Sequence, residues 1–258
     1  MVPEAQGARP VGGGAAKHAV LALQFLTRLP TPQVRDFHPE DLSRSAVWFP
    51  AVGLIVGGIV ALAAALGGAR DPWLGALFGT LAWTWVTGAL HIDGLADLAD
   101  ALGAGHSRPE RIREVLADPR CGSFAVVVIV LQLLTKLVAL RALSSGSLLW
   151  TLPWVSAAAR LGPLYWVSAL PPFAPNTDEP GSGERFAWHI PTRAIPLWAV
   201  VLGLLALTHP PLLLAGFLLA AWHLFLARTL GGQTGDALGA GIEVVESSTL
   251  LFLAFLAS

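Results

Sequence analysis

The sequence predicts an all-α protein that crosses a membrane several times, and its composition and apolar runs carry that prediction. Hydrophobic residues make up 54% of the 258 residues and charged residues only 13%, whereas soluble domains carry about 25% charged residues. The mean hydropathy is +0.63. So few charges cannot cover the surface of a soluble fold, and disordered chains are polar and charge-rich. A lipid bilayer is therefore the expected solvent.

Apolar runs approach the length of about 20 residues that a membrane-spanning helix needs. They predict six or seven transmembrane helices, at 46–66, 73–90, 122–140, 148–170, 195–208, 212–227 and 248–257. The last three runs are shorter than a full span. Ahead of them, residues 18–29 predict a short amphipathic helix that ends at a proline-rich stretch. Residues 1–16, rich in Gly, Ala and Pro, predict a flexible tail, and residues 17–258 a single membrane-embedded domain.

The charged residues predict which helix ends face the cytoplasm. With the N-terminus inside, the inner connections at 1–45, 91–121, 171–194 and 228–247 hold twelve Lys or Arg, and the outer connections hold two. Basic residues favour the cytoplasmic side. All acidic residues except Asp71 fall in the same inner connections. We therefore expect a multi-pass protein of the cell inner membrane with its functional groups at the cytoplasmic face.

Charge and cysteine content exclude several classes of function. A net charge of −1 without a basic tract gives a nucleic-acid partner no electrostatic support. A small-molecule permease would be expected to place acidic residues within its spans, and to show repeated halves. Neither feature is visible here. The single cysteine, Cys121, cannot form an internal disulfide.

The segment 91–105 carries the first candidate site. Asp93, Asp97 and Asp100 are spaced i, i+4 and i+7, which brings three carboxylates to one face of a helix. Such anions repel one another. Mg²⁺ would relieve the repulsion, because it prefers oxygen ligands and bridges to substrate phosphates. His91 lies just before the trio. A solvated acidic face gives the same pattern, but this stretch directly follows a predicted span.

The segment 228–246 carries the second candidate site. A glycine-rich turn that opens a helix exposes backbone N–H groups that can bind phosphate, and acidic residues that follow it can share a helical face. The glycines, the threonine and the acids in question are Gly231, Gly232, Thr234, Gly235, Asp236, Glu243 and Glu246. The turn is not a Walker A loop, since no Gly-Lys-Ser/Thr follows. A packing helix of small residues fits the pattern equally well.

Four further polar residues are candidates for binding phosphate. Asp118 and Arg120 follow a basic segment, and a guanidinium pairs bidentately with phosphate oxygens. Lys136 and Arg160 lie within predicted spans, where a charge is expensive and therefore indicates function. Their alternative is to extend toward the membrane surface.

At these segments the chain resembles the cobalamin synthase family, the adenosylcobinamide-GDP ribazoletransferases. The resemblance rests on five motifs in the family's order: Arg28 to Pro32, Ser43-Arg44 ahead of Phe49-Pro50, His91 to Asp100, Asp118 to Gly122, and Gly231 to Glu243. The chain departs from the pattern at Pro119, where the family has Ser. A proline lacks that hydroxyl and a backbone donor, so a phosphate contact at this position is not expected.

The resemblance implies phosphoryl transfer late in cobalamin biosynthesis. Members join adenosylcobinamide-GDP to α-ribazole, or to α-ribazole 5′-phosphate, and release GMP. It implies Mg²⁺ held by Asp93, Asp97 and Asp100 with Asp236, and catalytic roles for Asp97, Asp100 and Arg120. The substrate- or phosphate-binding candidates are His91, Asp118, Arg120, Lys136, Arg160, Gly231, Gly232, Thr234, Gly235, Glu243 and Glu246. A homo-oligomer, or association with other enzymes of the corrinoid pathway, is left open.

A CDP-alcohol phosphotransferase is the second enzyme hypothesis. That family also has a membrane domain, a metal and an Asp-rich helix. Its pattern carries an Arg after the alanine that Ala96 would match, and a longer gap before two further acids, whereas Asp97 and Asp100 follow too closely here.

Overall fold

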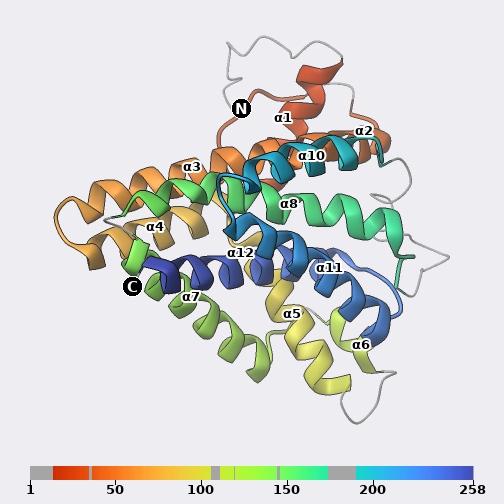
Figure 1. The fold of residues 1–258 in the computed structure, drawn as a ribbon. Helices are drawn as coiled ribbons and strands as arrows, with labels where there is room; N and C mark the ends of the chain where they lie inside the picture. Colours follow the sequence, from red (N-terminus) through yellow and green to blue (C-terminus); the bar gives the residue numbers. More distant parts are fainter. Residues whose placement is uncertain are drawn as a thin grey trace, which may run out of the picture.

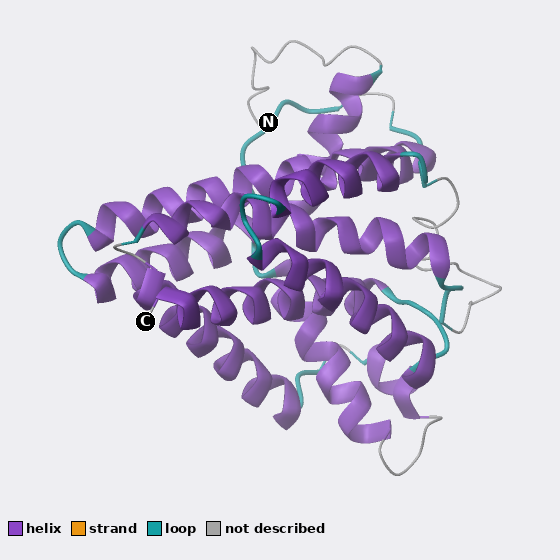
Figure 2. Cartoon of the chain, viewed as in Figure 1, coloured by secondary structure: helices purple, strands orange, loops and turns teal. Residues whose placement is uncertain are grey.

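The computed structural model describes residues 14–34, 37–105, 111–118, 120–143, 146–173 and 190–257. In these ranges every regular element is a helix, and the one extended contact is an isolated bridge between Pro172 and Gln233 (Figure 2). The all-α prediction is confirmed. Its elements are α1 (Ala15–Leu26), α2 (Pro39–Ser45), the 3₁₀ turn η1 (Ala46–Trp48), α3 (Phe49–Gly68), α4 (Pro72–Thr87), α5 (Leu90–Gly105), α6 (Arg111–Leu116), α7 (Ser123–Leu143), the 3₁₀ turn η2 (Ser147–Thr151), α8 (Leu152–Ala169), α10 (Ala194–Ala206), α11 (Pro211–Thr229) and α12 (Gly235–Ala257). The predicted tail falls mostly outside the described residues.

Length and apolar composition allow four of the described helices to cross a membrane. They are the continuous helix Glu40–Gly68, which ends with α3, and the helices α7, α11 and α12. The bent pair α4 and α5 makes a fifth if it counts as one span. The multi-pass architecture is therefore confirmed, but the count of six or seven is not. α10 has only 13 residues, and α8, which contains Arg160 and Pro163, is mostly buried in the bundle.

α12 differs most from the prediction. It is one helix of 23 residues, so the later part of the expected connection at 228–247 and the expected short span at 248–257 share a single helix. Charge is expensive inside a bilayer, which is why the predicted span excluded Glu243 and Glu246. In the structure both glutamates are buried against other helices, with relative exposures of 1% and 0%. The helix therefore continues past them.

α4 and α5 meet at 84°. The bend falls on Gly88 and Ala89, which both have a φ of 60°. This left-handed conformation is easy for glycine, but it costs an alanine about 1–2 kcal/mol. The predicted span at 73–90 therefore ends as a helix at Thr87, and α5 leaves in a new direction (Figure 1).

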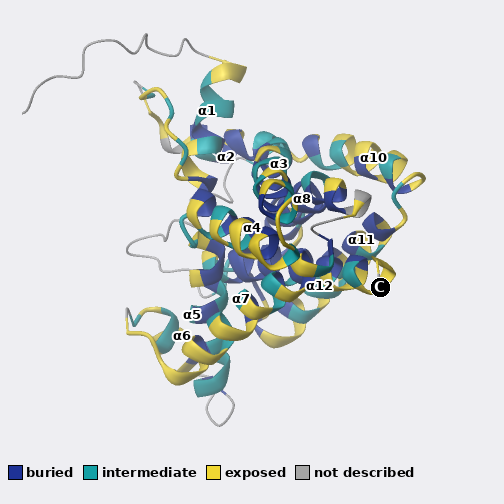
Figure 3. Cartoon of the chain, turned by 90° about the vertical axis from the view of Figure 1, so that its left-hand side faces the viewer, coloured by how far each residue is buried: buried dark blue, intermediate teal, exposed yellow. Residues whose placement is uncertain are grey.

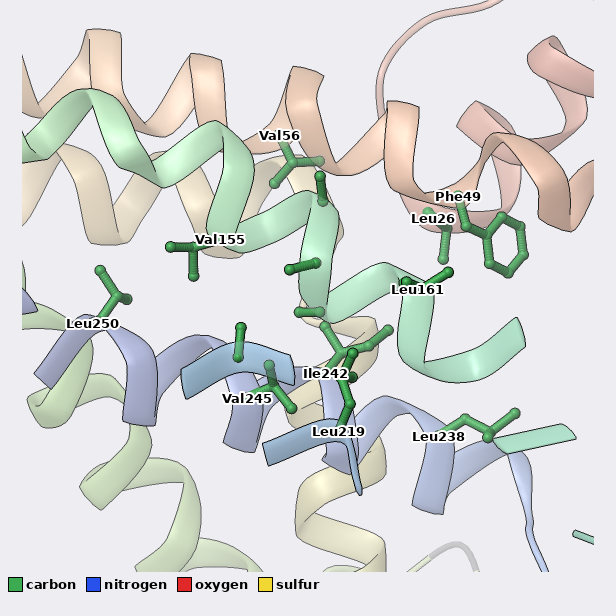
Figure 4. Close-up of a cluster of buried hydrophobic side chains, with 14 of the residues drawn as sticks. Leu26, Phe49, Val56, Val155, Leu161, Leu219, Leu238, Ile242, Val245 and Leu250 are labelled. Carbon is green, nitrogen blue, oxygen red and sulfur yellow. The ribbon is translucent and has the colours of Figure 1, made fainter. Parts of the chain in front are cut away.

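Close packing of α3 on α8 forms the centre of the bundle. A Cβ built on Gly57 would lie 2.5 Å from the carbonyl oxygen of Leu152, so the two backbones touch. Figure 4 shows the apolar side chains that fill the space between α3, α8 and α12, including Val56, Val155 and Val245. Figure 3 marks, from one side, which parts of the helices are exposed, and the exposed residues include large apolar side chains such as Leu66, Trp85 and Phe217. A lipid-facing surface is expected to have this character.

The bundle has two distinct ends. The α3–α4 turn and the C-terminus lie at one end, on the left of Figure 1, and the start of α12 lies at the other. The guanidinium of Arg141 lies 5.7 Å from the centre of the Trp73 ring, next to that turn. Arg70 is in the turn itself. The two basic residues predicted to be outside therefore share one end, away from the acidic helix α5.

Candidate active site

The two segments that the sequence singles out meet where α5 packs against the start of α12. A Cβ built on Gly94 would lie 2.8 Å from the carbonyl oxygen of Asp236 and 3.0 Å from its Cα. The two backbones are therefore in direct contact, and a side chain at position 94 has no room. This contact brings the acidic face of α5 to the glycine-rich segment.

Asp93, Asp97 and Asp236 are the carboxylates that this contact groups. The charges of Asp93 and Asp97 both act on Asp236, and Asp93 and Asp100 act on Asp97. Among the described residues, none of the three forms an ion pair with a basic side chain. The described residues contain no group of three or more His, Cys, Asp or Glu side chains that could hold a metal ion by themselves. The group is a concentration of negative charge, not a closed metal cage.

Asp100 has a different environment from its two neighbours on α5. Its Oδ2 accepts a hydrogen bond from the amide of Gly122 at 2.6 Å, and its Oδ1 accepts one from the amide of Ala125 at 3.0 Å. These amides lie at the start of α7, where backbone donors have no partner within the helix. Asp100 therefore joins α5 to α7. Both of its oxygens already have protein donors.

Asp118 and Arg120 form an exposed ion pair beside Asp100. The Nη2 of Arg120 lies 2.6 Å from Oδ2 of Asp118. Hydrogen bonds from the Arg120 side chain, and then from its amide, lower the pKa of the Asp118 carboxyl to about 2. The pair is therefore charged at any physiological pH. With Asp100 and Gly122 it lines a cavity of about 440 Å³, the Arg120 cavity. Pro119 lies outside the described residues.

The glycine-rich turn is held in place by the segment after α8. The amide of Phe173 donates to the carbonyl of Gln233 at 2.8 Å, and the amide of Gln233 donates to the carbonyl of Pro171 at 2.9 Å. A Cβ on Gly232 would lie 2.7 Å from that same carbonyl oxygen, so Gly232 serves this contact. Gly231 has a φ of +70° and open space around it. The turn therefore has a packed side and an open side.

The open side leads into α12. The Oγ1 of Thr234 accepts a hydrogen bond from the amide of Ala237 at 3.1 Å, which caps the helix. Gly235 is exposed, and a Cβ there would meet nothing within 4 Å. Of the candidate residues that the sequence marked in this segment, Gly235 and Asp236 line a cavity.

Lys136, Arg160, Glu243 and Glu246 form a separate network in the interior. The Nζ of Lys136 lies 2.8 Å from Oε2 of Glu243 and 3.4 Å from Oε2 of Glu246. Arg160 pairs with Oε1 of Glu246, and all four side chains are at most 1% exposed. Two cations and two anions balance, so the network is electrically neutral.

Neutral polar groups add hydrogen bonds to this network. Gln132 donates to the Glu243 carboxylate and to Ser247, and the Oγ of Ser156 donates to Oε1 of Glu246 at 2.9 Å. The Nζ of Lys136 also lies 4.2 Å from the centre of the Trp83 ring, a favourable cation–π contact. The structure thus gives each buried cation a partner inside the protein, although Nε and Nη2 of Arg160 have no hydrogen-bond partner among the described residues. The predicted role of the two cations in binding phosphate stays a prediction.

His91 lies between this network and the acidic group. Its side chain is 2% exposed, and within the described structure neither ring nitrogen has a hydrogen-bond partner. It lines a cavity of about 200 Å³, the α1–α12 cavity. The other lining residues come from five helices: Phe25, Leu26, Phe49, Leu90, Asp93, Gly94, Pro163, Gly235, Asp236, Leu238, Gly239 and Ile242.

Arg28 is a candidate that the sequence reasoning used as part of a motif but did not place in the site. It is exposed and lines a cavity of about 380 Å³ together with Asp93, the Arg28 cavity. Its amide donates to the carbonyl of Val86 at 2.7 Å. A Cβ on Gly88 would lie 2.5 Å from Nε of Arg28, so the side chain lies directly over the α4–α5 bend. Its position in a motif before the bend was the available signal.

Comparison with known proteins connects this geometry to a family. Residues 18–254 match the sequence profile of the family described as cobalamin-5-phosphate synthase. The chain belongs to that family. Curated relatives of the chain include proteins named adenosylcobinamide-GDP ribazoletransferase. The one from Thiobacillus denitrificans is 50% identical over 233 residues, which cover 90% of this chain and 92% of the relative.

Two further relatives carry the same name, and the alignment covers a similar share of each. The protein from Laribacter hongkongensis is 50% identical over 234 residues, covering 90% of this chain and 94% of its own. That from Novosphingobium aromaticivorans is 48% identical over 238 residues, covering 91% and 95%. No solved structure matches the chain. The match to the family profile begins in α1 and ends in α12, so every residue of the candidate site lies within it.

Proposed function

We propose that the protein transfers the phosphate-linked cobinamide of adenosylcobinamide-GDP to α-ribazole or α-ribazole 5′-phosphate, with release of GMP. The product is adenosylcobalamin or its 5′-phosphate, which closes the nucleotide loop late in cobalamin biosynthesis. The names of the relatives and of the family support this reaction. The observation that carries it is the contact of Gly94 with Asp236, because it groups three carboxylates beside cavities with nearby arginines.

The donor set of this group suits Mg²⁺. Proteins usually hold Mg²⁺ with one or two carboxylates, and substrate phosphates and water complete its shell. Asp93 and Asp97 would hold the ion, since each is a carboxylate without a basic partner in the described structure, and Asp236 would remain available to accept a proton. Asp100 is the weaker candidate because backbone amides occupy both of its oxygens. When bound, Mg²⁺ neutralises charge on the diphosphate and on the departing GMP.

The chain's own residues would bind and orient the two substrates. Arg28 shares its cavity with Asp93, and Arg120 shares its cavity with Asp100, so guanidinium groups flank α5 at two places. Guanidinium binds phosphate oxygens bidentately. For Arg120 this requires phosphate to displace the Asp118 carboxylate from their ion pair. The glycine-rich turn, open at Gly231 and Gly235, adds backbone donors.

In the proposed reaction, a ribose hydroxyl oxygen attacks the phosphorus attached to cobinamide. The bond from that phosphorus to the bridging oxygen breaks, and GMP leaves with the electron pair. The hydroxyl proton passes to a carboxylate, which we assign to Asp236, because this residue lines the α1–α12 cavity and also lies close to Asp93 and Asp97. The reacting groups would lie at the cytoplasmic surface of the inner membrane, where a large amphiphilic corrinoid has access.

A GMP-release assay tests this function. Purified protein in detergent or liposomes receives adenosylcobinamide-GDP, α-ribazole and Mg²⁺, and GMP is quantified by chromatography. We expect GMP and a corrinoid product in equal amounts, and no GMP when the acceptor is omitted or EDTA is added. A matched reaction with CDP-diacylglycerol and an alcohol tests the second enzyme class. CMP release there without GMP release in the first reaction would contradict the proposal.

A further inference from the structure

We infer that the α1–α12 cavity binds the aromatic base of the acceptor nucleoside, with His91 as the one polar side chain at its inner wall and Asp236 at its rim. This inference rests on the proposed function. It names which of the two substrates enters the bundle and which residues select it.

The size of the cavity decides between the two substrates. A cavity of about 150 Å³ lined by apolar side chains accommodates benzene, so this cavity of about 200 Å³ suits a fused aromatic bicycle. A corrinoid macrocycle is several times larger and cannot enter. No Lys or Arg is among the residues described as lining this cavity, so a diphosphate inside it would lie beside the carboxylates of Asp93 and Asp236 without a basic side chain to pair with.

The lining of the cavity is that of a site for a flat apolar base. Phe25 and Phe49 stack with their ring centres 5.8 Å apart and their planes 12° apart, and Phe25 is 41% exposed. A planar base can extend this stack. In Figure 4, Leu26 and Phe49 lie above Ile242 and Leu238, and all four line the cavity.

His91 supplies the polar recognition. It is buried at 2% exposure, and neither ring nitrogen has a partner within the described structure. Buried polar groups are normally hydrogen-bonded. Neighbouring atoms cover both ring nitrogens here, so a rotation of the ring toward the cavity would bring one of them to a polar atom of a bound ligand. A benzimidazole linked to ribose through one ring nitrogen has only its other ring nitrogen free. One buried hydrogen-bonding side chain matches that base, whereas guanine or adenine would bury several polar groups without partners.

The position of Asp236 follows from the same arrangement. A base in the cavity leaves its ribose at the rim, which we place at Asp93 and Asp236 because these lining residues are less buried than His91. The attacking hydroxyl is then beside the carboxylate group. The cavity therefore orients the acceptor, while the donor's phosphates stay outside it on α5.

Direct binding tests the inference without turnover. Equilibrium dialysis of α-ribazole against the purified full-length protein in detergent, with EDTA and without donor, gives its Kd. We expect 5,6-dimethylbenzimidazole alone to compete with α-ribazole, and adenosine to compete at least about tenfold more weakly. Failure of the free base to compete would overturn the inference.

Two variants locate the site in the cavity. His91→Phe removes the hydrogen bond and keeps a ring, so the Kd of α-ribazole should rise about tenfold. Gly239→Ala adds one methyl group to the cavity wall at an ordinary distance, 3.4 Å, from Cα of His91, and should weaken binding about tenfold as well. Gly216→Ala on α11 is the matched control, because its Cβ would meet nothing within 4 Å.

The outcomes separate the inference from the proposed function. The apparent KM for adenosylcobinamide-GDP should be unchanged in both variants, and their thermal unfolding should match the control. If the variants instead raise the apparent KM for adenosylcobinamide-GDP, the cavity holds the donor's guanine and the inference is wrong. If they bind α-ribazole normally while wild-type protein releases GMP, the cavity assignment alone fails. No GMP from the wild type, whatever the dialysis gives, refutes the proposed function.

Discussion

The backbone of Asp236 rests on Gly94, with 2.8 Å between the Asp236 carbonyl oxygen and the place where a Cβ at position 94 would lie. The atoms on the α12 side are main-chain atoms, so they cannot rotate away as the end of a flexible side chain can. The spacing between the two acidic segments is therefore set by the absence of one methyl group.

Gly94→Ala should separate α5 from α12. Overpacking costs about 1–3 kcal/mol, which lowers Tm by several degrees, and the displaced carboxylates should reduce the rate of GMP release at least about tenfold, since a shift of 1 Å near reacting groups costs this much or more. Rate and thermal unfolding in detergent measure both effects. Gly58→Ala on α3 is the control, because its Cβ would meet nothing within 4 Å. Wild-type activity in Gly94→Ala would contradict the assigned site.

Asp97 and Asp100 should respond differently to substitution, although the sequence presents them as equivalent. Asp100→Ala removes the acceptor of the Gly122 and Ala125 amides, and a buried donor left without a partner costs about 1–3 kcal/mol. Asp97→Asn should leave Tm unchanged and abolish GMP release, with or without added Mg²⁺. Urea or thermal unfolding beside the GMP assay separates the two. A similar loss of stability in both variants would show that Asp97 is structural.

Lys136→Met should destabilise the protein by about 3–5 kcal/mol, because it leaves a buried carboxylate without its cation. The double variant Lys136→Met/Glu243→Gln removes both charges and should recover most of the loss. Unfolding of the wild type, the two single variants and the double variant gives the coupling energy. Additive losses would mean that the pair is not coupled. A double variant that is stable and inactive would instead support the predicted role of Lys136 in binding substrate.

Cys121 offers a direct test of orientation, because it is the one cysteine of the chain and is exposed. A membrane-impermeant maleimide should label it in inside-out vesicles but not in intact cells, since the Arg120 cavity is proposed to face the cytoplasm. Cys121→Ser combined with Ala69→Cys moves the thiol to the α3–α4 turn and should reverse the result. Labelling of Cys121 from outside intact cells would place the site on the other face.

The helices predicted best are those whose signal is local. The runs that became α3 and α7 are long and mostly apolar, and the shorter run that became α11 is also mostly apolar, so hydropathy located all three. α12 was divided because Glu243 and Glu246 look costly in a bilayer. Their compensation comes from Lys136 and Arg160, more than eighty residues away, which no local pattern reveals.

The candidate site shows the same division. Helical spacing placed the carboxylates of Asp93, Asp97 and Asp100 on one helix, but it could not distinguish them. The difference arises because Asp100 meets amides from α7, a tertiary contact. The motifs, read as a family resemblance, brought Asp236 into the same group. Arg28 was overlooked because its relation to Asp93 depends on the bend between α4 and α5.

That bend gives α5 a beginning of its own. Had residues 72–105 formed one straight rod, position 93 would lie in mid-helix, with every peptide dipole cancelled along the rod by its neighbours. The break at Gly88 and Ala89 instead creates a positively polarised tip at His91 and Asp93, and the start of α12 at Gly235 places a second such tip in the same cavity wall. Each tip carries roughly half an elementary positive charge. Two of them offset about one of the three carboxylates, which lowers the repulsion among the acids gathered at this site and leaves less negative charge for a bound cation to balance.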